Sequence, residues 1–206
     1  LILFFASVCV QTQVETRTLN NGNLILEDVP NVPEEIKKEL KGYQNIRSAS
    51  FRGFKPDNEG LFISTRFGDV GQLHVVDKPL GMRKQITFFD EPIGSVSVQP
   101  NGGLIAFTMD SGGSENAQIY VMNPENGRTV LVSDGESRNG SVLWSRDGEK
   151  IAFGTTRRNG ASNDVWVMDY KYPEQAKMIF ASPDGTSWTP SDWSKDSKKI
   201  LLQNYI

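Results

Sequence analysis

The sequence has few of the residues on which most metal sites and many catalytic sites depend. Its 206 residues include a single cysteine, Cys9, and a single histidine, His74. One cysteine allows no internal disulfide, and a Cys-based zinc site needs several thiolates. The sequence also has no H-E-x-x-H helix motif, no phosphate-binding P-loop and no dinucleotide fingerprint. We therefore predict no bound metal and no cofactor.

Positive charge is also limited. Lys and Arg together number 22 against 25 Asp and Glu, for a net charge of −3, and no cluster of basic residues occurs. Because affinity for nucleic acid depends on neutralising phosphates with a basic surface, this composition argues against a nucleic-acid partner.

Long hydrophobic segments are missing too. The most apolar one, "LILFFASVCV" at residues 1–10, is too short to cross a bilayer as a helix. It resembles the hydrophobic region of a secretory signal peptide, followed by the polar "QTQ". We expect residues 1–12 to be a truncated signal peptide, the mature chain to be exported to the periplasm or beyond, and no span in the mature chain. A buried first strand is the alternative, and Cys9 is a poor lipidation site because Val8 precedes it.

No nucleophile motif accompanies the histidine. The sequence has no G-x-S-x-G elbow, and the glycine-flanked Ser114 in "SGGSEN" lacks the strand-turn-helix context that such a nucleophile needs. His74 lies in the strand-like segment "QLHVVD". We therefore predict no catalytic residue in this chain.

What the sequence does contain is an internal repeat. The segments "FKPDNEGLFIST", "VQPNGGLIAFTM", "WSRDGEKIAFGTT" and "WSKDSKKILLQN" each begin with an apolar anchor. Asp or Asn follows at the third position after the anchor, and Leu or Ile at the seventh. The four anchors are Phe54, Val98, Trp144 and Trp193. In the third copy, Asp147-Gly148 predicts a two-residue hairpin turn, because such turns require positive φ angles.

Each repeat offers four short strands. In the second repeat these are "SVSV", "LIAFTM", "QIYVMN" and "TVLVS", and no long helix interrupts them. Four strands in 40 to 50 residues indicate a β-propeller blade. The predicted fold is an all-β propeller with three complete blades at about 46–93, 94–138 and 139–187. An incomplete fourth blade covers 188–206, so we expect the chain to be truncated at its C-terminus as well.

A strand and a short helix are expected ahead of the blades, in residues 13–45. In "NVPEEIKKELKGYQN", Pro33 suits the first helical turn, and Gly42 is a plausible stop. Glu34 and Glu35 suit the positive end of that helix. Their alternative role is to bind the free amino group of a peptide, as a glutamate pair does in some propeller peptidases.

The positions of several side chains in the repeat predict their roles. The four anchors should lie between blades, where core packing is favoured over ligand binding for Trp144 and Trp193. Asp147, Asp169 and Asp196 recur at turn positions and are interpreted as turn formers. Arg157 and Arg158, at a hairpin tip in "TTRRNGASND", are candidates for contact with a carboxylate or a neighbouring domain, although a solvated tip is favoured.

Several longer phrases resemble a known family. These are "YQNIRSASF", "LFISTRFGDVGQLHVVDKPLGMRKQITFFDEPI", "GGSENAQIYVMN", "DGESRNGSVLWSRDGEKIAFGTTRRNG" and "DVWVMD". They resemble the N-terminal propeller of bacterial prolyl oligopeptidase family serine peptidases, in the dipeptidyl aminopeptidase or acylaminoacyl-peptidase branch. The resemblance implies a C-terminal α/β-hydrolase domain in cis, which carries the catalytic triad, and short peptides as substrates. No triad residue maps onto these 206 residues.

Two functions follow as hypotheses. The chain is a gating and substrate-selecting propeller of an exported peptidase, or it is a periplasmic propeller of the TolB kind that binds partner proteins. A propeller sugar lyase is a distant third, because no His and Gln cluster is visible. The open arc of blades predicts self-association or poor solubility.

Overall fold

The computed structural model describes residues 14–205. The predicted signal peptide and Cys9 lie outside these residues. The chain divides into two units between Asn45 and Ile46. No helix among the described residues is both long and apolar enough to cross a membrane.

The first unit consists of a hairpin and one helix. Strands β1 (Thr16–Leu19) and β2 (Leu24–Glu27) pair antiparallel around a short 3₁₀ turn. Helix α1 spans Glu34–Gln44. The prediction that Gly42 ends the helix is wrong, since α1 continues past it until the backbone N–H of Asn45 donates to the carbonyl of Lys41. Pro33 lies at the N-cap, one position before the first helical residue.

The second unit is built from four antiparallel sheets, of which three have four strands. The first blade contains β3 (Ala49–Phe54), β4 (Leu61–Thr65), β5 (Gln72–Val76) and β6 (Lys84–Gln85). The second contains β7 (Ile93–Val98), β8 (Ile105–Met109), β9 (Gln118–Met122) and β10 (Thr129–Leu131). The third contains β11 (Asn139–Trp144), β12 (Lys150–Thr155), β13 (Asp164–Asp169) and β14 (Tyr172–Phe180). The last sheet pairs β15 (Ser187–Trp193) with β16 (Ile200–Tyr205).

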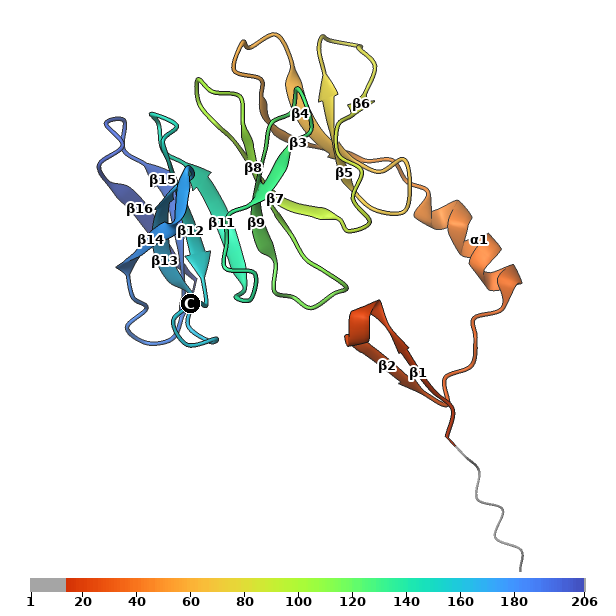
Figure 1. Cartoon of the computed structure of the whole chain (residues 1–206). Coiled ribbons are helices and arrows are strands. Elements are labelled where there is room, and N and C mark those ends of the chain that lie inside the picture. The colour runs from red at the N-terminus through yellow and green to blue at the C-terminus, as the bar shows by residue number, and fades with distance from the viewer. Residues whose placement is uncertain (1–13, 206) are drawn as a thin grey trace, which may run out of the picture. The chain divides into compact units, whose positions relative to one another are not determined.

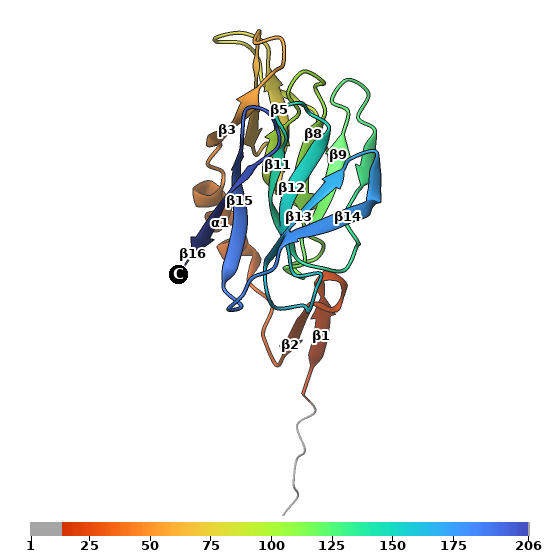
Figure 2. The same ribbon diagram turned by 90° about the vertical axis from the view of Figure 1, so that its left-hand side faces the viewer.

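In each four-stranded sheet the strands pair in sequence order, as expected for a propeller blade. The first strands of successive sheets contact one another, β3 with β7, β7 with β11, and β11 with β15. The sheets of this unit therefore follow one another as a fan (Figure 1) and stack face to face (Figure 2). Together these features confirm the predicted all-β fold of four-stranded blades.

Stacking explains why each second strand has three consecutive apolar residues, instead of alternating apolar and polar ones. Because successive side chains point to opposite faces of a sheet, a blade between two others buries both faces. On β8, Ile105 and Phe107 pack toward the first blade with Phe62 and Leu73. Ala106, between them, packs toward the third blade in a second core.

Two of the anchors also join blades by hydrogen bonds. The indole Nε1–H of Trp144 donates to the carbonyl of Ser97 on β7 at 3.1 Å, and that of Trp193 donates to Leu143 on β11 at 3.3 Å. Both tryptophans are buried. Core packing between blades is therefore confirmed for Trp144 and Trp193.

The other two anchors differ from each other. Val98 packs on the backbone of β3, where a Cβ added to Gly53 would lie 2.7 Å from Val98 Cγ2. Phe54 is 62% exposed, so the prediction that it lies between blades is wrong for the structure described. The reason is that no sheet of residues 46–205 covers that face of the first blade.

The turn chemistry needs one correction. In the turn after Trp144, only Gly148 has a positive φ (74°), and Asp147 does not. The turn is closed by Gly148 N–H donating to the carbonyl of Ser145 and is longer than the predicted two-residue loop. Asp147 acts through its side chain, whose Oδ1 accepts from Ser145 Oγ and from Glu149 N.

The other predicted turn formers behave in the same way. Asp196 Oδ1 accepts from Ser194 Oγ at 2.6 Å, and Asp169 Oδ1 accepts from Lys171 N at 2.8 Å. Asp side chains favour turns because they bond to the backbone two residues ahead. The turn-forming role of these aspartates is thus confirmed.

Candidate functional site

Both arginines proposed as contact residues are held by carboxylates of this chain. Arg157 Nε donates to Asp134 at 2.9 Å, and its guanidinium lies over the ring of Trp166, 5.1 Å from its centre. Arg158 donates twice to Asp164, at 2.7 and 3.0 Å. Each arginine thus already has an internal partner.

Asp164 explains why Arg158 is needed. The carboxylate is fully buried at the start of β13, where it also accepts from the backbone N–H of Ser182. A buried carboxylate requires a compensating charge, and the forked guanidinium provides it. The bond to Arg158 lowers the pKa of Asp164 against the opposing effect of its burial.

Asp134 is held by a second network. Burial favours the protonated form of its carboxyl, but hydrogen bonds from the hydroxyl and backbone of Ser137, and from Arg157, outweigh that effect. Together they lower the pKa of Asp134 to about 2. The carboxylate therefore stays ionised and keeps Arg157 in place.

The glutamate pair of the first unit is exposed on α1. Glu34 is bonded to Lys37 Nζ at 2.6 Å, one turn along the helix, and its side chain is 85% exposed. Glu35 is exposed beside it in the first turn. Their position suits the helix dipole.

His74 is fully buried on β5. Its Nδ1–H donates to the carbonyl of Gln72 at 3.1 Å, and its ring packs edge-on against Phe67. Burial lowers the pKa of His74 although the bond to Gln72 opposes this effect. Its Nε2 has no hydrogen-bond partner among the described residues, and no serine is paired with it. Ser114 lies in the loop between β8 and β9 and donates to Asp110 instead.

Hydrogen bonds between turns join neighbouring sheets at two of the three junctions in residues 46–205. Between the second and third blades, Gln99 Nε2 donates to the carbonyl of Gly148 at 2.7 Å. Between the third and fourth sheets, Asp147 N–H donates to Ser197 Oγ at 3.0 Å. Both bonds connect the turn after one anchor with the turn after the next.

At the junction of the first and second blades, Lys55 occupies the position that Gln99 has in the next blade. Its ammonium turns back to its own blade, 3.0 Å from Asp57 and 3.8 Å from Asp77. Among residues 14–205, no hydrogen bond joins the turn after Phe54 to the turn after Val98. This junction therefore has no bond between turns, and we call it the open junction.

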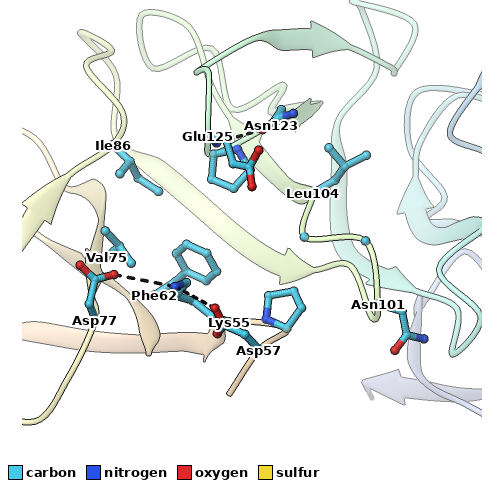
Figure 3. A pocket seen from close by; sticks show the side chains of 14 residues that line it. Lys55, Asp57, Phe62, Val75, Asp77, Ile86, Asn101, Leu104, Asn123 and Glu125 are labelled. Atoms are coloured by element: carbon cyan, nitrogen blue, oxygen red, sulfur yellow. Dashed lines mark hydrogen bonds and ion pairs between the residues drawn. The ribbon is translucent and has the colours of Figure 1, made fainter. Parts of the chain in front are cut away.

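A cleft of about 470 Å³ lies at the open junction, and we call it the blade 1–2 cleft (Figure 3). Its apolar surface comes from Phe62, Val75, Ile86 and Leu104, with Pro56 and Pro124. Its polar groups are Lys55, Asp57, Asp77, Asn101, Asn123 and Glu125. Both blades contribute to both sets, so a bound molecule would contact the two blades at once.

Charge in the cleft is mainly negative, with one lysine against three carboxylates. The hydrogen bond to Asp57 raises the pKa of Lys55, although partial burial opposes it. The pKa of Asp77 is lowered, chiefly by its bond to Lys84. These groups therefore remain charged and satisfy one another, whereas the carboxylate of Glu125 has no hydrogen bond or ion pair among the described residues.

The sequence analysis missed this cleft. Its signal was the residue directly after each anchor, which is lysine in the first repeat, glutamine in the second and serine in the third and fourth. Only the folded structure shows that Gln99 bonds to the turn of the next blade, whereas Lys55 bonds within its own blade.

The cleft offers apolar and charged groups for binding a ligand. Within the described residues, no three His, Cys, Asp or Glu side chains form a group that would hold a metal ion. The cleft combines an apolar floor with an unpaired carboxylate, which are features of small ligand sites.

No protein-family model and no curated protein matches the sequence. Solved structures do match. TolB from Acinetobacter baumannii has a TM-score of 0.61 at 18% identity, over 92% of this chain and 42% of that one. A prolyl endopeptidase has a TM-score of 0.61 at 14% identity, over 94% of this chain and 36% of that one. The β-propeller domain of the Trilobed protease from Pyrococcus furiosus has a TM-score of 0.55 at 15% identity, over 77% and 49%.

The chain thus spans less than half the length of each of these three structures. At sequence identities of 14–18%, the similarity to these structures is one of fold. It includes both groups that the sequence analysis named, the TolB propellers and the propellers of prolyl peptidases. The chain is accordingly a set of β-propeller blades of the kind found in these proteins.

Proposed function

We propose that this chain is the non-catalytic, substrate-selecting propeller of an exported serine peptidase that acts on short peptides. In this proposal an α/β-hydrolase domain in cis supplies the catalytic residues. The observation that carries it is the backbone match over 94% of the chain to a prolyl endopeptidase, together with the family phrases in the sequence.

The properties of the blades are consistent with this role. His74 is buried and bonded to a backbone carbonyl. Arg157 and Arg158 are paired with carboxylates of this chain. A ring of such blades selects by size, because a narrow passage admits an extended peptide and excludes a folded domain. Selection of this kind needs rigid walls and no reactive group of its own.

Export is part of the proposal. It rests on the signal-like residues 1–10.

The test is to express the product of the whole reading frame that includes residues 1–206 and treat it with a fluorophosphonate, which labels activated serines. We expect labelling that requires a serine outside these residues, and faster cleavage of short peptides than of an unfolded protein. Absence of labelling would contradict the proposal.

The second candidate is a periplasmic propeller of the TolB kind. It is favoured by the match to A. baumannii TolB, whose TM-score equals that of the prolyl endopeptidase. This candidate predicts no reaction with fluorophosphonate and a stable complex with an envelope protein. Affinity purification from the envelope fraction, with a cross-linker to identify the contacting residues, distinguishes the two.

A further inference from the structure

We propose that the blade 1–2 cleft binds a peptide segment in which a cationic amine lies next to an aliphatic side chain. The inference goes beyond the proposed function, because it assigns a ligand to the described residues themselves and requires no hydrolase domain.

The first step is that the junction at this cleft, unlike the other two junctions of residues 46–205, has no hydrogen bond between consecutive turns. The two other junctions of this unit are joined by a hydrogen bond between consecutive turns, from Gln99 to Gly148 and from Asp147 to Ser197. At the first junction no such bond forms, and the ammonium of Lys55 bonds within its own blade instead. Lysine at the position after the anchor therefore leaves this junction without the bond that Gln99 makes at the next one.

The second step concerns the floor. Phe62 on β4 is buried, while Val75, Ile86 and Leu104 are partly exposed around it. An aliphatic side chain that covers them removes apolar surface from water on both partners, at about 25 cal/mol per Å². A volume of about 470 Å³ is within the usual range for small-ligand sites.

The third step concerns charge. Lys55 forms ion pairs with Asp57 and Asp77 (Figure 3). Asp77 is also bonded to Lys84, so these groups have partners within the protein. Glu125, on the turn between β9 and β10, has none among the described residues and lines the same cleft. A ligand that places a positive group at Glu125 completes the charge balance of the cleft, whereas an anionic ligand would meet an excess of carboxylates.

Two sources supply this chemistry, a peptide's free N-terminus and a lysine side chain. The experiment therefore uses three probes with the full chain: Leu-Ala-Ala-amide, acetyl-Ala-Leu-Lys-Ala-amide, and the second peptide with norleucine in place of lysine. Affinities are measured by calorimetry at low and high salt. We expect at least one amine-bearing probe to bind, with weakening by salt, and the norleucine peptide to bind more weakly.

Two variants test the residues. Glu125→Gln should weaken binding of the preferred probe by about two- to fivefold, as expected for an exposed ion pair, and Glu125→Lys should weaken it further. Glu136→Lys is the matched control, because Glu136 is an exposed glutamate of the same blade outside the cleft. It should leave the affinity unchanged. Replacing leucine by serine in the probe tests the floor without altering the protein.

Which of the two amine probes binds better identifies the source of the cation. Equal affinity of the norleucine and lysine peptides, combined with no binding of the free N-terminus, would overturn the proposal. So would equal binding to the wild type and the Glu125→Lys variant, provided that the variant melts like the wild type. None of these outcomes depends on whether a hydrolase domain exists, so they leave the peptidase proposal to its own test.

Discussion

Trp144 contributes to stability in two ways, by burial of its ring and by a hydrogen bond, and two substitutions can separate them. Its ring is buried between the second and third blades, and its Nε1–H donates to the carbonyl of Ser97. Trp144→Phe keeps most of the apolar contact but leaves that carbonyl without its donor, so we expect a loss of about 1–2 kcal/mol in the free energy of unfolding. Trp144→Ala also leaves a cavity, and about 3–5 kcal/mol should be lost. Urea denaturation measures both changes.

Trp188 provides the matched control for the hydrogen bond. Its Nε1 is buried without a partner among the described residues, and its ring packs on Phe180. Trp188→Phe therefore removes an unsatisfied donor and should cost less than Trp144→Phe. An equal cost for both substitutions would show that the inter-blade hydrogen bond contributes nothing.

Asp134 gives a pH dependence with a defined sign. Its pKa is about 2 in the folded protein against an ordinary value of 3.8, so the folded state binds the proton more weakly than the unfolded state. The resulting stabilisation is present in full above the unfolded pKa and is lost as the pH falls from about 4 to about 2. With allowance for partial exposure, it amounts to about 1–2 kcal/mol.

Asp134→Asn should remove this share of the pH dependence. The measurement is the difference in the free energy of unfolding between pH 6 and pH 3, which should be smaller in the variant than in the wild type. Glu136→Gln, two residues away, should leave that difference unchanged. If Asp134→Asn also leaves it unchanged, the network around Arg157 does not perturb this carboxyl.

At the scale of the element, the hairpin turns join the blades as well as connecting strands. Gly148 has a φ of +74°, and an added Cβ would lie 2.7 Å from the carbonyl oxygen of Pro100 in the preceding blade. Gly127 has a φ of +71° with nothing within 4 Å of the same position. Both Gly→Ala changes incur the backbone strain of about 1 kcal/mol, and only Gly148→Ala adds a clash between blades.

We therefore expect Gly148→Ala to lower the melting temperature clearly more than Gly127→Ala does. The comparison isolates the inter-blade contact because the two glycines share the same backbone conformation. Equal decreases in melting temperature would mean that the close contact between Gly148 and the carbonyl of Pro100 does not contribute to stability.

Strand order and blade number could be predicted because they depend on local patterns. The anchor, the turn residue and the apolar strand recur at fixed offsets, and each specifies structure within about ten residues. The turn after Trp144 was predicted less well, because Asp147 shapes it through side-chain hydrogen bonds and not through its own φ. The partner of Arg157 could not be predicted, since Asp134 is 23 residues away in the chain. Asp164 is only six residues from Arg158, but the burial of its carboxylate, which makes the pair necessary, depends on the folded blade.

The blade 1–2 cleft shows the same limit. Lys55 was visible in the repeat, but its consequence depends on a turn in the next blade, more than forty residues away. A missing contact between two repeats leaves no trace in either repeat alone. Sites that arise between repeats are therefore the part of this fold that sequence patterns reveal least.

At the scale of the whole molecule, the exposed face of the first blade predicts self-association. Phe51, Phe54 and Leu80 are 57%, 62% and 106% exposed, and no sheet of residues 46–205 covers them. The edge of β16 is also unpaired in the described structure. Apolar faces and open strand edges of this kind favour contacts between chains. Two different surfaces can meet head to tail, and such contacts give rings or open chains of copies.

Phe54→Lys should therefore shift the chain toward monomer in sedimentation velocity over a wide range of concentration, because it places a charge at the centre of that face. Phe88→Lys is the control, since Phe88 is 77% exposed but lies on the connection between β6 and β7. It should leave the association unchanged. A wild-type chain that sediments as a monomer and melts in one sharp transition would contradict the prediction, because the exposed face would then be tolerated in water without a partner.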